Sequence, residues 1–446
     1  MMEIYFYKGD DNTLANIKGK PENESGESQE SADLKAKTKK LQEAFLKVLD
    51  NKNLSFLLGS GCSSFKIENE GFKEVGIPVM APLAKEFYSL VEFEEPKEWL
   101  KTELSIDVEH DNFSTNLETF LSTLHSLSFY HSKTREDVKE EKPFAELSNE
   151  NKVEFIIKQA RNFLLEKCLN AENAKSEQGK ASIDKPLIET YKQFYRKLLS
   201  RNPTLPRLNI FTTNYDLYSE RAMDLLGIHY VNGFTGGISK FFNPAIFNYA
   251  LAEKMDLSQS KWSVIDNFFY LYKIHGSVNW IEADGENKLF KVKEIQEPTL
   301  EELREKETIM IHPTPLKYNA SLGSPYSDLF REFQKKLMQN NNILVTIGYS
   351  FSDEHINNLI FQAFTIPSFR LIVIGEPTEK NAIGKLLELN DTRIWIIGEK
   401  WPADKSDYTP LYFFKNFVEQ ILPDLTAEDL DHKMEATINN LKNLLK

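Results

Sequence analysis

The fold is decided by the stretch Leu54-Ser55-Phe56-Leu57-Leu58-Gly59-Ser60-Gly61-Cys62-Ser63, where an apolar run passes directly into a glycine-rich turn. A strand that ends in Gly-x-Gly lets the backbone approach a pyrophosphate closely, and a following helix would offer it free N–H groups. The full Gly-x-Gly-x-x-Gly fingerprint is absent, since residue 64 is Ser. Taken alone, the motif is better explained as a tight turn without a ligand.

Three further polar clusters follow apolar runs in the same way. They are Thr212-Thr213-Asn214-Tyr215-Asp216 after Leu208 to Phe211, His275-Gly276 after Leu271 to Ile274, and Gly348-Tyr349-Ser350-Phe351 after Ile343 to Ile347. Each cluster falls where a buried parallel strand would end, and nucleotides bind at that edge of open α/β sheets. Four clusters in this order predict one site built from several strand ends.

Each of these side chains also has a plainer structural explanation. An Asn amide can hold a water or a carboxamide by donating and accepting at once, and a neutral His can take a proton from a hydroxyl or a water. Asn214 and Asp216 could equally cap the next helix, and a strand-end His such as His275 is more often structural. Ser350 could bind a phosphate or a ribose hydroxyl, but Ser350 or Asp353 could instead be a helix N-cap.

The remaining pattern predicts an α/β protein: a Rossmann-like parallel sheet with helices on both faces, plus a helical insertion. Near-continuous Ile, Val and Leu runs are typical of strands that are buried on both faces. We expect strands at 2–7, 209–212, 271–274, 309–312, 343–347, 371–374 and 394–397. Helical periodicity begins at Asp33, which is a candidate N-cap.

Four regions are expected along the chain. Residues 1–32 form an N-terminal strand and a flexible linker. Residues 33–64 and 207–400 together form the Rossmann-like nucleotide-binding domain. Residues 65–206 form the helical insertion, and residues 401–446 form a C-terminal helical segment.

The composition excludes some classes of function. The chain has 446 residues, of which 41% are hydrophobic, and its formal net charge is −13. This acidity argues against a broad nucleic-acid-binding surface, which needs a basic stripe. Two cysteines, Cys62 and Cys168, are too few for a disulfide framework and suit a reducing cytoplasm. The sequence shows neither a signal peptide nor an apolar run long enough to cross a membrane.

Together, the four motifs resemble those of the sirtuin-like superfamily, and more closely its bacterial branch of NAD-consuming antiphage defence proteins. The segment 59–63 is similar to the sirtuin Gly-Ala-Gly-x-Ser, and the segment 212–216 is similar to Thr-Gln-Asn-x-Asp. His275-Gly276 matches the family's His-Gly, and Gly348-Tyr349-Ser350 matches its Gly-Thr/Ser-Ser. The resemblance extends from about Leu54 to Gly398.

The resemblance implies a role for each motif, with NAD as the substrate. The residues implied to bind NAD are Gly59, Ser60, Gly61, Ser63, Thr213, Asp216, Gly348 and Ser350. The glycine-rich turn would hold the pyrophosphate, and Asp216 would grip nicotinamide. Asn214 would orient the attacking water, and His275 would act as the base.

Two departures from the family pattern direct the functional expectation. The four-Cys zinc module of the sirtuin deacetylases cannot form from two cysteines, so no zinc is expected. The family's Pro-x-Phe-Arg loop is also missing after Ser63. Both departures suit the defence branch, in which water rather than acetyl-lysine attacks the ribose. We therefore expect an NAD glycohydrolase that releases nicotinamide and ADP-ribose and depletes NAD as an antiphage effector.

The resemblance further implies control by assembly, as a homo-oligomer that could join a HerA-like hexameric ATPase. From the acidity and the short apolar runs we expect neither a membrane nor a direct nucleic-acid partner. Two other classes of function stay open. One is a binding module that senses NAD or ADP-ribose and regulates a partner ATPase, and the other is an NAD-dependent deacylase or ADP-ribosyltransferase. Hydrolysis and cyclisation of NAD share the same cationic ribose, so the sequence does not separate them.

Overall fold

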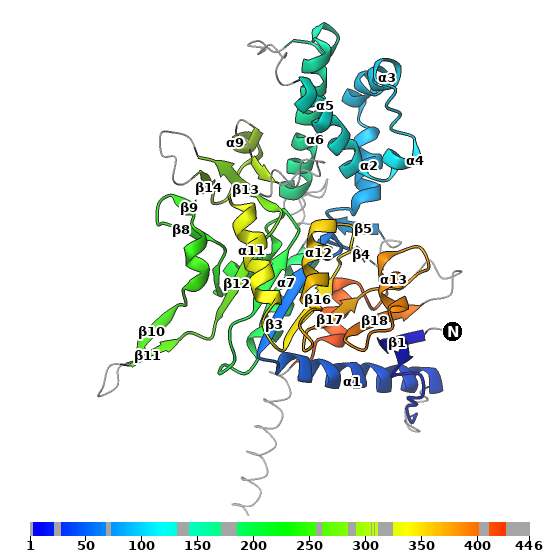
Figure 1. Cartoon of the computed structure of the whole chain (residues 1–446), viewed down its shortest axis with the longest axis vertical. Helices are drawn as coiled ribbons and strands as arrows, with labels where there is room; N and C mark the ends of the chain where they lie inside the picture. Colours follow the sequence, from blue (N-terminus) through cyan, green and yellow to red (C-terminus); the bar gives the residue numbers. More distant parts are fainter. Residues whose placement is uncertain are drawn as a thin grey trace, which may run out of the picture.

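A mostly parallel sheet of nine strands organises the part of the chain that the structure describes (Figure 1). The structure is a computed structural model. It describes residues 3–21, 28–67, 73–131, 142–170, 185–255, 261–283, 291–304, 306, 308–310, 324–400 and 410–424. The strand order is β2-β1-β18-β17-β16-β3-β6-β12-β7.

Seven neighbouring strands of this sheet run parallel. They are β18 (Ile394–Lys400), β17 (Arg370–Ile374), β16 (Asn342–Ile347), β3 (Asn53–Leu58), β6 (Asn209–Thr212), β12 (Phe268–Lys273) and β7 (His229–Val231). The strand expected near the N-terminus is confirmed as β1 (Glu3–Lys8), which pairs antiparallel with β18, and β2 (Asp11–Asn12) follows it at the edge. The carboxyl ends of β3, β6, β12 and β16 therefore meet at one edge, because these four strands are parallel neighbours.

Helices cover both faces of the sheet, because alternate side chains of its strands enter two separate cores. In β3, Phe56 and Leu58 join one core, whereas Leu57 joins the other. The first core is closed by α1 (Gln29–Leu49), α7 (Lys185–Leu199), α8 (Tyr218–Leu225), α14 (Phe414–Asn416) and the turn η6 (Phe417–Ile421). The second is closed by α11 (Tyr326–Leu337), α12 (Glu354–Ala363) and α13 (Ala382–Glu388). The predicted fold class is confirmed.

Helix α1 begins earlier than its periodicity predicts. Ser28 is its N-cap, and the Ser28 side chain accepts a hydrogen bond from the Ser31 N–H. The prediction that Asp33 is the cap is wrong, because Asp33 lies inside the helix and accepts from the Gly19 N–H at 2.7 Å. Residues 22–27 of the predicted linker lie outside the described residues.

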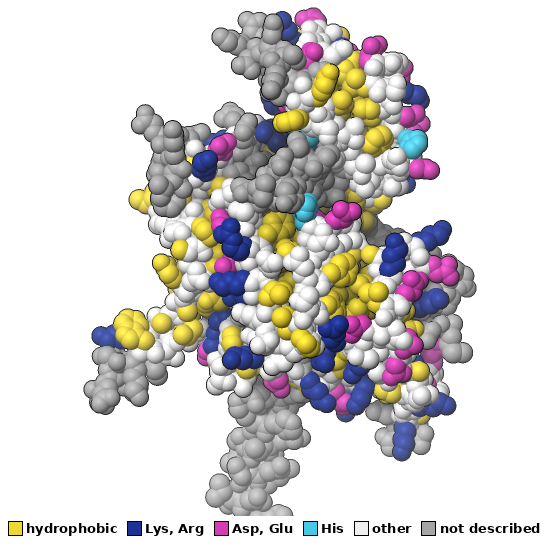
Figure 2. Space-filling view, in the orientation of Figure 1, with side chains coloured by type: hydrophobic (Ala, Val, Ile, Leu, Met, Phe, Trp, Pro, Cys, Tyr) yellow, Lys and Arg dark blue, Asp and Glu magenta, His cyan; other side chains and the backbone are white. Residues whose placement is uncertain are grey.

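A second, five-stranded antiparallel sheet is built from segments on either side of β12 in the chain. Its order is β15 (Thr308–Met310), β13 (Gly276–Glu282), β14 (Val292–Glu294), β9 (Lys240–Phe242) and β8 (Phe234–Thr235). The strand expected at 309–312 belongs here as β15 and not to the parallel sheet; residues 311 and 312 lie outside the described residues. A separate hairpin, β10 (Ala252–Met255) with β11 (Lys261–Val264), projects from the body and exposes apolar side chains, including Trp262 (Figures 1 and 2).

The region between β3 and β6 is mainly helical and stands above the carboxyl edge of the sheet (Figure 1). A hairpin of β4 (Ser64–Ile67) and β5 (Lys73–Gly76) leads into it. Its helices are α2 (Met80–Tyr88), α3 (Glu94–Glu103), α4 (Asp111–Ser114), α5 (Leu117–His131) and α6 (Asn149–Asn170), around a core of their own. The helical insertion is predicted to end at residue 206, but α7 packs in the core of the sheet through Tyr191 and Phe194. The predicted loops at 133–142 and 171–185 fall almost wholly outside the described residues.

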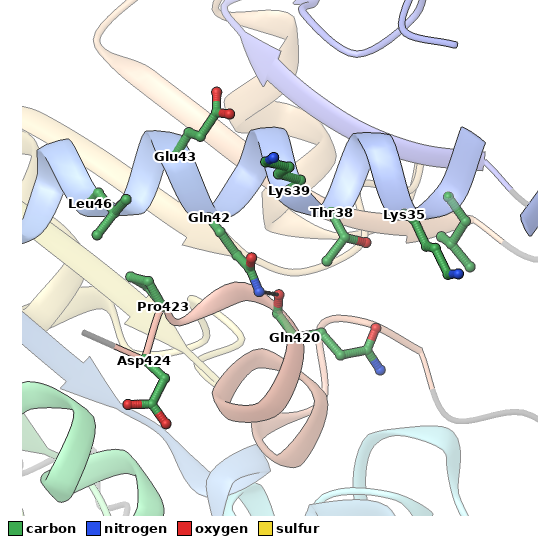
Figure 3. Close-up of a pocket in the computed structure, with 10 residues that line it drawn as sticks. Lys35, Thr38, Lys39, Gln42, Glu43, Leu46, Gln420, Pro423 and Asp424 are labelled. Atoms are coloured by element: carbon green, nitrogen blue, oxygen red, sulfur yellow. Dashed lines mark hydrogen bonds between the residues drawn. The ribbon is translucent and has the colours of Figure 1, made fainter. Parts of the chain in front are cut away.

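The last described residues, 410–424, pack against α1. The Gln42 side-chain amide donates to the Gln420 carbonyl at 2.9 Å, beside a groove of about 470 Å³ between α1 and η6 (Figure 3). The helix expected over 425–445 lies outside the described residues. Among the described helices, none combines the length and the apolar character that crossing a membrane requires.

Candidate active site

The four strand-end motifs line one cavity of about 360 Å³ at the carboxyl edge of the sheet. This volume lies within the range of about 300–1,000 Å³ that is usual for small-molecule sites. The predicted site residues on its wall are Ser60, Ser63, Thr213, Asn214, Asp216, His275, Gly348 and Ser350. Gly59 and Gly61 are not on the wall; they belong to the turn directly behind it.

The opposite wall of the cavity comes from the helical region and is mostly apolar, apart from Thr115 and Asn116. It includes Ile77, Pro78, Met80, Leu83, Leu117, Leu121 and Leu164. The sequence pattern assigned Leu117, Leu121 and Leu164 to helix faces alone, and it gave no role to the other four residues. A heterocyclic ring could lie against this wall, because such ligand sites combine apolar surface with a few placed polar groups.

The glycines of the first motif allow the turn at 59–61 to lie in close contact with the turn at Gly348. The Gly59 N–H donates to the Ile347 carbonyl at 2.9 Å, and the Gly61 N–H donates to the Gly348 carbonyl at 3.0 Å. A Cβ on Gly59 would lie 2.3 Å from the Gly348 carbonyl oxygen, which is inside van der Waals contact. The helix expected directly after this motif does not follow, because β4 begins at Ser64 after a single 3₁₀ turn, Ser60–Cys62.

Gly59→Ala is therefore expected to destabilise the fold. The added methyl group must push apart the 59–63 turn and the 348 turn, so we expect the free energy of unfolding to fall by about 1–3 kcal/mol. Gly237→Ala is the matched control, since a Cβ there meets nothing within 4 Å. Urea unfolding of the two variants checks this; equal midpoints would contradict the contact.

Asn214 is held on the wall by its amide nitrogen and leaves its oxygen unused. Its Nδ2 donates to the Gly59 carbonyl at 2.9 Å and to Ser63 Oγ at 2.8 Å. The side chain is 8% exposed, and Oδ1 has no hydrogen-bond partner among the described residues. A buried acceptor without a donor costs about 1–3 kcal/mol. This oxygen is therefore ready to accept a hydrogen bond from a ligand or a water.

Asp216 is linked to Asn214 through Ser63. Ser63 Oγ donates to Asp216 Oδ2 at 2.6 Å, while Asp216 Oδ1 accepts from the Tyr218 N–H at 3.1 Å as α8 begins. Asp216 therefore contributes to capping α8, which was one of the two roles considered for it, although Leu217 occupies the N-cap position. Burial raises the pKa of Asp216, and the cation of Lys273 together with these hydrogen bonds opposes that rise.

His275 forms a close pair with Asp353. Its Nε2 lies 3.0 Å from Asp353 Oδ2, and both residues are 8% exposed. Asp353 is the N-cap of α12, and its Oδ1 accepts from the backbone N–H groups of His355 and Ile356 at 3.1 and 3.4 Å. The helix cap therefore fixes the carboxylate that holds the imidazole. Ser350 is not the cap; it is exposed, and its Oγ lies 3.0 Å from Ser352 Oγ.

Sequence reasoning missed two charged residues of this site. Asp353 was considered only as a helix cap, although its place just after the fourth motif put it at the same sheet edge. Lys273 was counted within the apolar run that precedes His275, and it lies buried behind Asp216. A lysine inside an otherwise apolar strand was the available signal, since a buried lysine needs a partner.

Comparison with protein families supports a sirtuin-like assignment for three of the four motifs of the site. Residues 208–387 match the family model described as SIR2-like domain, a span that is less than half of the chain. It contains Thr212–Asp216, His275-Gly276 and Gly348–Ser350 but begins after the first glycine-rich turn. Domains of this family bind NAD and are usually NAD-dependent enzymes. The comparison with curated proteins found no match.

The described residues hold no group of three or more His, Cys, Asp or Glu side chains that could bind a metal ion. Cys62 and Cys168 are free thiols, and both are buried. Burial raises the pKa of Cys168, which lines the cavity, to about 12. Neither thiol is thus a ready nucleophile, since the thiolate is the reactive form.

Proposed function

We propose that this chain hydrolyses NAD at the bond between nicotinamide and ribose, releasing nicotinamide and ADP-ribose. The observation that carries the proposal is the convergence of four distant motifs on one cavity, with Asn214 and the His275–Asp353 pair on its wall. The SIR2-like match over residues 208–387 supports NAD as the ligand.

The charge of the cavity suits this reaction. When the C1′–N bond breaks, its electron pair leaves on nicotinamide, which departs as a neutral molecule, and positive charge develops on the ribose. Asp216 and Asp353 line the cavity, while no Lys or Arg is among its described lining residues. Fixed carboxylates near a developing cation lower the barrier, because they are already oriented when the charge appears.

Asn214 and His275 supply the remaining steps. The unused Oδ1 of Asn214 can accept a hydrogen bond from the attacking water and hold it in one pose. As the new C1′–O bond forms, the imidazole of His275 takes the proton of that water, and Asp353 stabilises the resulting imidazolium. Neither a metal ion nor a covalent intermediate is needed for these steps to balance.

The direct test is to incubate the purified chain with NAD and to quantify the products by liquid chromatography. Equal amounts of nicotinamide and ADP-ribose are expected. Release of nicotinamide with cyclic ADP-ribose would instead indicate cyclisation, and acetyl-ADP-ribose formed only with an acetylated peptide would indicate a deacylase. NAD binding without any product, both for the chain alone and for the chain together with its partner under activating conditions, would favour the sensing module.

The biological setting that we propose rests on the resemblance. An uncontrolled NAD glycohydrolase would drain its own cell, so its activity must be restrained until it is needed. We place the protein in the cytoplasm as an antiphage effector, restrained by homo-oligomeric assembly and by a HerA-like hexameric ATPase as partner.

A further inference from the structure

The glycine-rich turn has few donors left for the phosphates of a dinucleotide. The N–H groups of residues 59, 61, 62 and 63 all donate to backbone carbonyls of the protein, at 2.9 to 3.0 Å. Within 59–63, only the N–H of Ser60 has no acceptor among the described residues. The described lining residues of the cavity also include no Lys or Arg. A diphosphate in this cavity therefore needs donors from another part of the wall.

The first turn of α5, in the helical region, supplies such donors. Thr115, Asn116 and Leu117 line the cavity, and the 15-residue helix α5 stands above the carboxyl edge of the sheet (Figure 1). Asn116 caps the helix, because its Oδ1 accepts from the Thr119 N–H at 3.0 Å. The N–H groups of Leu117 and Glu118 have no acceptor in the part of the chain that the structure describes. The cavity thus meets two free donors and the positive end of a helix dipole.

Two other helices begin at the cavity, α8 and α12, and each already holds a carboxylate there. Asp216 accepts from the Tyr218 N–H as α8 begins, and Asp353 is the N-cap of α12. The cap of α5 is a neutral amide, so its positive end is left for an anion from outside the protein. An independent feature of the same wall indicates a ligand: Asn214 is 8% exposed, and its Oδ1 has no partner among the described residues.

We propose that the first turn of α5 binds the diphosphate of the dinucleotide, so that the helical region and the sheet hold one ligand from opposite sides. Helix N-termini bind phosphates because their free N–H groups and the helix dipole both favour negative charge. The hydroxyl of Thr115 can donate to the same phosphates. This inference rests on the proposed function for its ligand, and it gives a binding role to a helix outside the residues 208–387 that match the SIR2-like model.

Asn116→Asp tests this contact without removing the cap. Asn and Asp cap helices about equally well, so α5 should still begin at Leu117 while the new charge opposes an anion. ADP-ribose is the probe, because it carries the diphosphate and is not consumed by the proposed reaction. Calorimetry should show binding to Asn116→Asp that is weaker by about tenfold or more. Asn116→Ser, which keeps a neutral cap, should bind ADP-ribose with about the affinity of the wild type.

Asn381→Asp is the matched control for the added charge. Asn381 caps α13, where its Oδ1 accepts from the Gly384 N–H at 2.8 Å, and it does not line the cavity. The substitution adds the same charge to the same kind of helix end, so the affinity for ADP-ribose should stay at the wild-type value. An equal loss of affinity in Asn381→Asp and Asn116→Asp would mean a general effect of charge and would refute the site. Equal affinities of Asn116→Asp and Asn116→Ser would refute it as well.

Hydrogen exchange gives a second readout that needs no variant. ADP-ribose should slow the exchange of the amides of Leu117 and Glu118, because their N–H groups gain acceptors. Unchanged exchange, or no binding of ADP-ribose to the wild type, would overturn the inference, and this measurement decides it if Asn116→Asp does not fold. The proposed function can fail separately. If no nicotinamide is released from NAD while ADP-ribose protects these two amides, hydrolysis is wrong and the diphosphate site stands.

Discussion

Asn214→Ala is expected to lower kcat for nicotinamide release by about 10²- to 10³-fold, the cost of losing one oriented group at a reacting centre. The Oδ1 of Asn214 lies on the cavity wall and has no donor among the residues that the structure describes, so none of these residues replaces it. KM should change much less, because the apolar wall and Asp216 remain. Initial rates at saturating NAD measure the effect.

A matched control separates chemistry from stability. Asn214→Ala also removes donors to the Gly59 carbonyl and to Ser63, so some loss of stability is expected. Asn279→Ala removes a comparable buried amide, which donates to the Ile295 carbonyl at 3.0 Å outside the cavity. Both variants should unfold at lower temperature, but only Asn214→Ala should lose turnover. Equal turnover rates for the two variants would contradict the proposal that Asn214 orients the attacking water.

His275→Ala is expected to lower kcat by about 10²- to 10⁴-fold, the range for loss of a general base. The kcat of Asp353→Asn should lie between the kcat of His275→Ala and that of the wild type. Asn caps a helix about as well as Asp, so α12 should still begin correctly while the charge beside the imidazole is lost. Rates for the series, compared with those of His229→Ala, measure the contribution of the pair, since the side chain of His229 is exposed at the start of β7.

The same series tests the proposed setting in cells. NAD should fall after phage infection in cells that carry the wild type and stay level with His275→Ala. His229→Ala should behave as the wild type does. An equal fall of NAD in cells that carry His275→Ala would contradict the role of His275.

The parallel sheet could be predicted because each of its inner strands is an apolar run closed by a glycine or a polar cluster. The segment 343–347 is such a run, and it became β16 almost residue for residue. The start of α1 could not be read from periodicity, because a side chain such as Ser28 caps a helix before any apolar residue shows the pattern. The place of β15 depends on pairing with β13 across a long stretch of chain, which local pattern does not report.

The polar residues of the candidate site could be predicted from the sequence. The residues that hold those side chains in place could not. Strand ends identify Asn214 and His275, since the carboxyl edge of the sheet gathers them. The partner of His275 and the cation behind Asp216 depend on distances between separate elements. Those distances, such as the 3.0 Å between His275 Nε2 and Asp353 Oδ2, exist only once the chain is folded.

The interlocked turns at Gly59 and Gly348 carry an evolutionary consequence. Almost 290 positions separate them in the chain, yet neither backbone leaves room for a side chain on the other. If a larger residue replaced the glycine of one turn, the backbone of the other turn would have to change at the same time. Otherwise the contact between the two turns would be lost. The two glycines should therefore be inherited as a unit, even where the intervening region diverges freely in length and composition.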